Sequence, residues 1–282
     1  MKSLSVKSLA VAFCAVVCAV VPMTGAITAS AAESAYDPVY VTDSNGVVCT
    51  ANMQSINKGN MMWFPEEMLD EDFEGEYPVL VWANGTVCPP ALYYEFLSEV
   101  ASEGYIVVTN TELFAGNGKE QKNSIDFILA EDEDEDSIFY NKIDEEHIGV
   151  MGHSQGGMSS VNCANLDSRV DCVFSIAGNS SKSDAKKLTV PTFFATGSSD
   201  WIVPSWKYVK PAYNNCTATA VYASLDGAKH TEVCTNPSAY SGYAVDWFDA
   251  WLKDDSDALA VFQEGGALDN DDNWSSVARK GL

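Results

Sequence analysis

The chain has 282 residues, of which 46% are hydrophobic and 20% are charged; this is typical of a globular protein and excludes a disordered, collagen-like or coiled-coil chain. Acidic residues outnumber basic ones by 40 to 16, so the formal net charge is −24 at pH 7. A surface this acidic repels phosphate backbones and anionic lipids, so we expect neither nucleic acid nor a membrane as a partner.

The start of the chain has the pattern of a secretory signal peptide. Lys2 and Lys7 precede an uncharged apolar run over 8–21, and small residues follow up to Ala32. A membrane anchor is the alternative, but the second half of the uncharged stretch is only weakly apolar. We therefore predict that residues 1–31 are a cleaved leader and that the mature protein is secreted.

Six cysteines remain after the predicted leader, an even number that suggests disulfides in an exported protein. Buried thiols are the alternative for each pair. No Cys-x-x-Cys pair is present, which argues against structural zinc. The pairing favoured by closeness along the chain is Cys163–Cys172, Cys216–Cys234 and, by remainder, Cys49–Cys88.

Apolar runs and helical periods alternate along the rest of the chain. The run at 77–83 is almost continuously apolar, as in a strand buried on both faces. The next segment, 93–102, has apolar residues on one helical face and stops at Gly104. The later predicted strands are 105–109, 147–151, 172–176, 190–195 and 219–224, and the later predicted helices are 124–130, 155–165 and 240–252.

This alternation predicts an α/β domain with a mainly parallel central sheet flanked by helices. No linker or change of composition divides the chain between Tyr36 and Leu252, so we expect one domain over 36–262. Residues 263–282 are predicted to form a polar tail over the surface. Phe262 and Trp274 are its expected docking points.

A Gly-x-Ser-x-Gly motif lies where a predicted strand meets a predicted helix, at Gly152, Ser154 and Gly156. In this context the serine sits on a sharp turn that exposes its hydroxyl at the carboxyl edge of the sheet. The helix that follows favours negative charge at its N-terminus. Glycine is needed on both sides because strand and helix approach too closely for a Cβ. The motif predicts Ser154 as a nucleophile.

A serine nucleophile needs a base, and the chain has three histidines. His147 opens the strand that leads to the motif, at the end far from the serine. The side chain of His153, inside the motif, is expected to point away from that of Ser154. His230, in a loop after a strand, is therefore the predicted base.

The base needs an acid that fixes its tautomer. Asp200 follows the strand at 190–195, at the edge of the sheet where ligands bind in α/β folds. The alternative, Asp226, lies in the turn just before His230. Because Asp226 is only four residues from His230, we expect it to shape that turn, and we predict Asp200 as the acid. The resulting order, serine, aspartate, histidine, is that of α/β-hydrolases.

An oxyanion hole needs two backbone N–H donors. Gln155 provides one because it follows the nucleophile. The loop after the strand at 77–83, Asn84-Gly85-Thr86, is expected to provide the other through Thr86.

The segment Val150–Gly157, followed by Asp200 and His230, resembles the dienelactone-hydrolase and cutinase-like branch of the α/β-hydrolases. That branch includes hydrolases of poly(ethylene terephthalate), and the resemblance spans 77–252. It implies an α/β-hydrolase fold without a lid domain, and a secreted serine carboxylic-ester hydrolase that forms an acyl-enzyme on short-chain acyl esters or polyesters. The implied triad is Ser154, Asp200 and His230, with Thr86 and Gln155 as the oxyanion pair. A bridge between the acid-loop and histidine-loop regions in that branch agrees with the pair Cys216–Cys234.

The chain departs from that branch at two loops. Asn84-Gly85-Thr86 lacks the aromatic residue that clamps substrate there, and 177–180 lacks a tryptophan after the strand that follows the nucleophile helix. We expect Trp201 to replace part of this clamp and Asn179 to contact substrate. Trp82, within a strand, is predicted to be core.

Two other functions remain open: a serine peptidase or amidase with the same triad, and a non-catalytic binding protein on a hydrolase scaffold. The first usually has an added lid or domain, and the second usually lacks a triad member; neither feature is seen in the sequence.

The acidic run 131–136 is predicted to be a solvated surface, because its spacing matches no calcium loop. We expect a monomer that acts on an ester substrate without a metal or organic cofactor.

Overall fold

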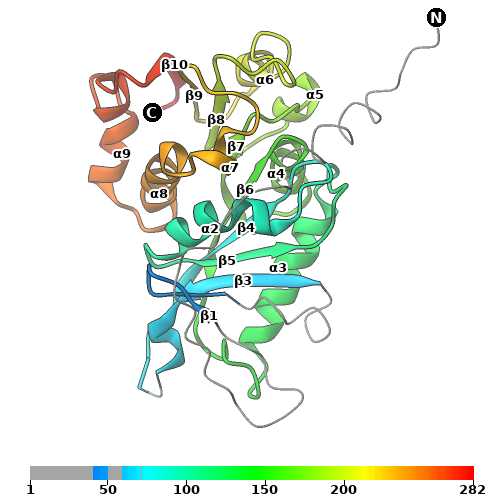
Figure 1. The fold of residues 1–282 in the computed structure, drawn as a ribbon, viewed down its shortest axis with the longest axis vertical. Helices are drawn as coiled ribbons and strands as arrows, with labels where there is room; N and C mark the ends of the chain where they lie inside the picture. The colour runs from blue at the N-terminus through cyan, green and yellow to red at the C-terminus, as the bar shows by residue number, and fades with distance from the viewer. Residues whose placement is uncertain (1–40, 50–58, 71) are drawn as a thin grey trace, which may run out of the picture.

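The computed structural model describes residues 41–49, 59–70 and 72–282 (Figure 1). The predicted signal peptide lies outside these residues. Within them the strands are β1 (Val41–Thr42), β2 (Val47–Cys49), β3 (Asn60–Pro65), β4 (Tyr77–Ala83), β5 (Ile106–Asn110), β6 (Ile143–His153), β7 (Val170–Ile176), β8 (Thr192–Gly197), β9 (Ala220–Leu225) and β10 (Trp274–Lys280). The α-helices are α2 (Tyr94–Ala101), α3 (Lys119–Asp132), α4 (Gln155–Leu166), α5 (Lys182–Ala185), α6 (Val209–Asn215), α7 (Glu232–Thr235), α8 (Ser238–Leu252) and α9 (Ser256–Phe262), and short 3₁₀ turns lie at Glu66–Leu69, Pro90–Tyr93 and Ala267–Asp269.

These strands form one twisted sheet in the order β1-β2-β3-β5-β4-β6-β7-β8-β9-β10 (Figure 1). The six strands from β5 to β9 in this order run parallel to one another. Antiparallel strands extend the sheet at both edges, with β1 to β3 at one and β10 at the other. The predicted α/β fold with a mainly parallel sheet is confirmed.

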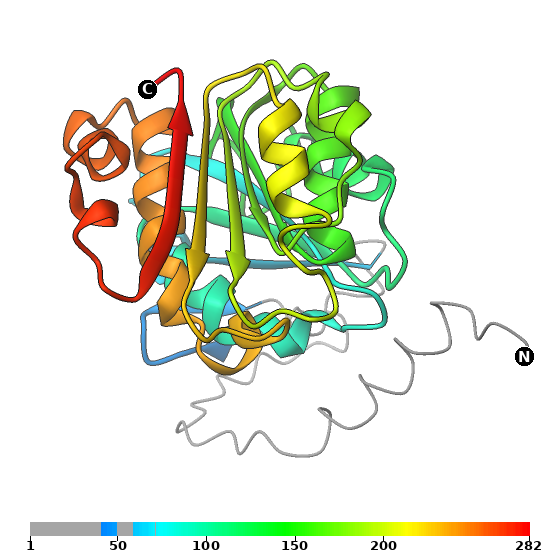
Figure 2. The ribbon, with the colours of Figure 1, turned by 90° about the horizontal axis from the view of Figure 1, so that it is seen from above.

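Helices cover both faces of the sheet (Figure 2). Residues of α2, α8 and α9 pack on one face, and residues of α3, α4 and α6 pack on the other. Along β4, Leu80 and Trp82 face the first core while Val79 and Val81 face the second. Alternate side chains of a strand point to opposite faces, so a strand covered on both sides reads as a continuous apolar run.

The edges of the sheet hold the main differences from the predicted elements. β10 belongs to the stretch predicted to be a surface tail, yet it pairs with β9 in an antiparallel ladder. Its sequence, Trp-Ser-Ser-Val-Ala-Arg-Lys, has no strong apolar pattern, because an edge strand is half exposed and polar residues suit it. Phe262 and Trp274 are both buried, as expected of docking points. The short strands β1 to β3 were likewise not expected.

The structure corrects the two favoured disulfides. Cys163 on α4 packs against one face of the sheet, whereas Cys172 on β7 packs against the other. Cys216 and Cys234 are also on opposite faces. The sheet separates the members of each pair, and a disulfide requires Cα atoms within about 7 Å. Neither bond is formed, because closeness along the chain does not place two residues on the same face.

Cys49 and Cys88 do share one face of the sheet, so their pairing stays a prediction.

In the acidic run, the Asp132 carboxylate accepts the backbone N–H groups of Lys142 and Ile143 at 2.8 and 3.0 Å, which closes the turn between α3 and β6. Across the described ranges, no set of three or more His, Cys, Asp or Glu side chains is arranged to hold a metal ion. The same ranges contain no helix both long and apolar enough to cross a membrane.

Candidate active site

The Gly-x-Ser-x-Gly motif forms a sharp turn between β6 and α4. Ser154 has φ 58° and ψ −117°, a conformation that is strained for a residue with a side chain, and its N–H donates to the Ile176 carbonyl at 2.9 Å. A Cβ built on Gly156 would lie 1.9 Å from the carbonyl oxygen of Ala83. The predicted close approach of strand and helix is therefore present, and it pushes Ser154 to the carboxyl edge of the sheet.

This approach makes Gly156 sensitive to a single methyl group. Gly156→Ala forces the backbone of β4 and α4 apart, and we expect a loss of about 3 kcal/mol or more in the free energy of unfolding. Gly242→Ala is the matched control, because Gly242 lies on α8 with nothing within 4 Å of its Cβ position. Alanine there should stabilise the helix by about 0.5–1 kcal/mol. Urea unfolding of both variants measures the difference, and equal effects would contradict this packing argument.

Ser154, His230 and Asp200 form a continuous hydrogen-bonded line. The Ser154 hydroxyl lies 2.9 Å from His230 Nε2, and His230 Nδ1 lies 2.7 Å from Asp200 Oδ2. Ser154 is partly exposed, whereas His230 and Asp200 are buried. With the serine O–H donating to Nε2 and Nδ1–H donating to the carboxylate, the imidazole is in the tautomer that can accept the serine proton.

The second oxygen of Asp200 is also held in place. Its Oδ1 accepts the backbone N–H groups of Ile202 and Val203 at 2.9 and 2.8 Å. Burial alone would raise the pKa of Asp200, but the hydrogen bond and charge of His230, together with these two N–H groups, outweigh burial and hold the pKa below its usual value. The aspartate therefore stays ionised next to the histidine.

The other candidate acid and another candidate base from the sequence lie away from Ser154. Asp226 is exposed and accepts a hydrogen bond from the Ser275 hydroxyl. His147 lies near the start of β6, where its Nδ1 is 2.7 Å from the carboxylate of Asp144. Of the candidate acids and bases, the structure brings only Asp200 and His230 to Ser154.

The loop after β4 is braced next to Ser154. Asn84 accepts the Trp82 indole N–H at 3.1 Å and donates to the Asn110 carbonyl at 2.7 Å. The Gly85 N–H donates to the Tyr93 hydroxyl at 3.1 Å, so this amide does not serve an oxyanion. Thr86, the next residue, stays the predicted donor from this loop. Gln155 stays the other, since the first N–H of a helix has no intrahelical acceptor.

Three of the six non-glycine residues with positive φ in the described part of the chain lie at this edge of the sheet. Val87, Ser154 and Ala177 all have φ between 48° and 59°, although none is glycine. They follow the carboxyl ends of β4, β6 and β7, which are neighbours in the sheet. A β-branched residue such as Val87 rarely adopts this conformation. Strain held at one edge by surrounding structure is typical of functional sites.

The predicted substrate-binding residues differ in exposure. Trp201, next to Asp200, has 61% of its surface exposed, and Trp82 is fully buried, as expected for core. Asn179 follows β7, and its buried Oδ1 has no hydrogen-bond partner in the described part of the chain. Contact of Trp201 and Asn179 with substrate stays a prediction.

Phe114 is a candidate that the sequence analysis missed. Its loop follows β5 and lies against both sides of the site: the Val87 N–H donates to the Leu113 carbonyl at 3.0 Å, and Gly116 lies against the side chain of Gln155. Phe114 itself is 59% exposed. An aromatic residue in a loop at the carboxyl end of a parallel strand was the signal available in the sequence.

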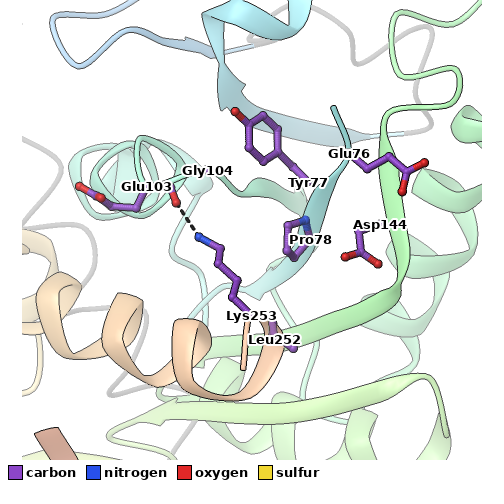
Figure 3. A pocket seen from close by; sticks show the side chains of 8 residues that line it. All are labelled: Glu76, Tyr77, Pro78, Glu103, Gly104, Asp144, Leu252 and Lys253. Carbon is purple, nitrogen blue, oxygen red and sulfur yellow. Dashed lines mark hydrogen bonds between the residues drawn. The ribbon is translucent and has the colours of Figure 1, made fainter. Parts of the chain in front are cut away.

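Two cavities in the described part lie away from Ser154. One, of about 560 Å³, lies at the start of β4 and β6 and is lined by residues that include Glu76, Asp144 and Lys253 (Figure 3). The amine of Lys253 donates to the Glu103 carbonyl at 2.8 Å. The other, of about 750 Å³, lies between the loop before His230 and α8. Neither lining includes a serine paired with a histidine.

The fold, and the serine, histidine and aspartate at the carboxyl ends of its parallel strands, define an α/β-hydrolase. A family model described as PET hydrolase-like matches residues 77–266. The match covers more than half of the chain, and the chain belongs to this family. The resemblance to the polyester-hydrolase branch is thereby confirmed.

The chain is also similar to characterised enzymes at low identity. It is 26% identical to cutinase est2 of Thermobifida alba over 164 residues, which cover 56% of this chain and 54% of that protein. It is 22% identical to a bis(hydroxyethyl) terephthalate hydrolase of Streptomyces coelicolor over 205 residues, or 70% and 63% of the two chains. For cutinase 2 of Thermobifida cellulosilytica the identity is 24%, over 56% and 62%. The chain thus spans from about half to under two thirds of the length of these relatives.

Proposed function

We propose that the protein is an exported serine carboxylic-ester hydrolase that acts on short-chain acyl esters or polyesters. The observation that carries the proposal is the hydrogen-bonded line from Ser154 through His230 to Asp200, at a strained turn beside two loops with backbone N–H groups. Membership of the PET hydrolase-like family and similarity to cutinases support an ester as the substrate. The leader pattern in residues 1–31 supports export.

The geometry suits an acyl-enzyme mechanism. Ser154 Oγ attacks the ester carbonyl carbon while its proton passes to His230 Nε2, and the carbonyl oxygen becomes an oxyanion held by the N–H groups of Thr86 and Gln155. Collapse of this intermediate releases the alcohol, which takes the proton from His230. Water then attacks the acyl-enzyme with His230 as its base, and the carboxylic acid leaves as Ser154 recovers its proton. Asp200 keeps the imidazole oriented and stabilises its charged form.

The surroundings of the site favour a neutral substrate with apolar or aromatic parts. Phe114 and Trp201 expose aromatic surface on the loops after β5 and β8, and aromatic rings bind such groups well. The net charge of −24 disfavours the approach of anionic substrates. Together these features support uncharged esters, including the repeat units of polyesters.

The test is hydrolysis of p-nitrophenyl esters with acyl chains from two to sixteen carbons, next to p-nitroanilides of the same acids and bis(2-hydroxyethyl) terephthalate. We expect turnover of the short esters and of the terephthalate ester, with labelling of Ser154 by a fluorophosphonate. Turnover of anilides in preference to esters would replace the proposal with an amidase. No turnover together with no labelling would overturn it in favour of a non-catalytic role.

A further inference from the structure

A chain of buried hydrogen bonds runs beneath the candidate site. The Gly85 N–H lies 3.1 Å from the Tyr93 hydroxyl oxygen, which lies 3.0 Å from His153 Nδ1. His153 Nε2 lies 2.7 Å from the main-chain carbonyl oxygen of His230. The side chains of Tyr93 and His153 are 1% exposed, so water does not compete for these bonds. The chain therefore links the loop after β4 to the loop that carries the base.

The direction of each proton in this chain is determined. A carbonyl oxygen only accepts, so the proton of His153 is on Nε2. Burial, aided by the nearby His230, lowers the pKa of His153 to about 3, so the ring is neutral and its Nδ1 is an acceptor. The Tyr93 O–H must then donate to Nδ1, and its oxygen accepts the Gly85 N–H. This arrangement pairs both the Gly85 N–H and His153 Nδ1, and the Cys88 thiol is a further neighbour of the Tyr93 hydroxyl.

Three residues of this chain belong to the catalytic arrangement or adjoin it: Gly85, His153 and His230. Gly85 precedes Thr86, the predicted oxyanion donor, and His153 precedes Ser154. A Cβ on Gly85 would lie 2.8 Å from the Tyr93 oxygen and 3.2 Å from His153 Nδ1, so a side chain there would disrupt both bonds. His230 is held twice, at its ring by Asp200 and at its carbonyl by His153.

We propose that Tyr93 and His153 are positioning residues that hold the oxyanion loop, the nucleophile turn and the catalytic histidine in one geometry. The proposal rests on the proposed function, because the groups that it positions are those of the hydrolase mechanism. Misplacement of a reacting group by about 1 Å can lower a rate about 100-fold, so a small shift of either loop is enough for a kinetic effect.

The first test compares two buried tyrosines. Tyr93→Phe removes the hydroxyl at the centre of the chain. Tyr105→Phe is its matched control, because Tyr105 is equally buried and its hydroxyl donates to Asp249 at 2.6 Å. Tyr105 lies just before β5, at the opposite end of the sheet from Ser154. We expect kcat for a p-nitrophenyl ester to fall about 10- to 100-fold in Tyr93→Phe with KM within about threefold, and Tyr105→Phe to keep the wild-type kcat.

The second test uses His153. In His153→Gln the amide nitrogen can still donate to the His230 carbonyl, whereas His153→Leu removes that donor. We expect His153→Gln to retain at least about ten times the kcat of His153→Leu, because one oriented donor is restored. A role in packing alone predicts no such rescue by the polar residue.

Nitrogen-15 NMR of labelled histidine tests the chain without any substrate. We expect His153 to be neutral with its proton on Nε2 between pH 5 and 8, and its Nδ1 signal to move in Tyr93→Phe. This readout survives if the protein hydrolyses no ester, so failure of the proposed function and failure of this proposal are distinguishable. The proposal is overturned if Tyr93→Phe folds and matches Tyr105→Phe in kcat, if His153→Gln and His153→Leu have equal kcat, or if His153 has its proton on Nδ1.

Discussion

Replacement of Ser154 by alanine is expected to lower kcat for a short p-nitrophenyl ester by about a million-fold, which leaves only the residual catalysis by substrate binding and the oxyanion hole. The variant keeps the binding surface and the backbone N–H groups but lacks the oxygen that lies 2.9 Å from His230. KM should change little, because the hydroxyl acts in the chemical step. Steady-state kinetics with enzyme at micromolar concentration measure the residual rate.

Ser159→Ala provides the control for this change. Ser159 is a buried serine of α4, the helix that begins directly after Ser154, and its hydroxyl has no hydrogen-bond partner within the described residues. The change should leave kcat within about twofold, since removal of an unpaired buried hydroxyl is nearly neutral. Retention of more than a thousandth of the wild-type kcat in Ser154→Ala would contradict a serine nucleophile at this position.

Asp200→Asn is expected to lower kcat by about ten-thousand-fold while it preserves the fold. The asparagine amide can donate to His230 Nδ1, which moves the imidazole proton to Nε2, the nitrogen that must accept the proton of Ser154. Asp226→Asn is the matched control from the neighbouring loop, and we expect it to retain full activity. Equal losses of kcat in the two variants would show that Asp200 is not the acid of the triad.

The same substitution changes how stability depends on pH. The pKa of Asp200 is lower in the folded protein than in the unfolded chain, so its ionised form stabilises the fold above the unfolded pKa of about 3.9. That contribution is lost as pH falls from this value through the folded pKa. Urea unfolding of the wild type between pH 2 and 5 should therefore show a decline that is smaller in Asp200→Asn.

The sequence was most informative where local chemistry determines structure. β4 matches the predicted bounds, because a strand buried on both faces has an unbroken apolar run. The turn at Ser154 was predictable because its glycines are required by an approach that no other residue tolerates. Asp200 followed from its place after a strand, at the sheet edge where parallel strands end, and His230 followed from the exclusion of the other two histidines.

The remaining features depend on contacts between distant segments. Cys163 and Cys172 are close in sequence, but Cys163 belongs to a helix on one face of the sheet and the Cys172 side chain points to the other face. Tyr93 is 60 residues from His153, and nothing in the local pattern around either indicates a shared hydrogen bond. β10 lacks an apolar pattern because an edge strand is half exposed. Its pairing with β9, which the local sequence does not indicate, is what identifies it as a strand.

The position of β10 has a consequence for the order in which the enzyme matures. β10 pairs with β9, and the Asn273 carbonyl accepts the N–H of Asp226 at 2.8 Å, so this strand supports the loop that leads to His230. The ribosome makes β10 after every other strand of the sheet. A nascent chain can complete its nucleophile turn early, yet the base loop lacks its support until residues 274–280 have emerged. Hydrolytic competence should therefore arise late in synthesis, once β10 has paired with β9.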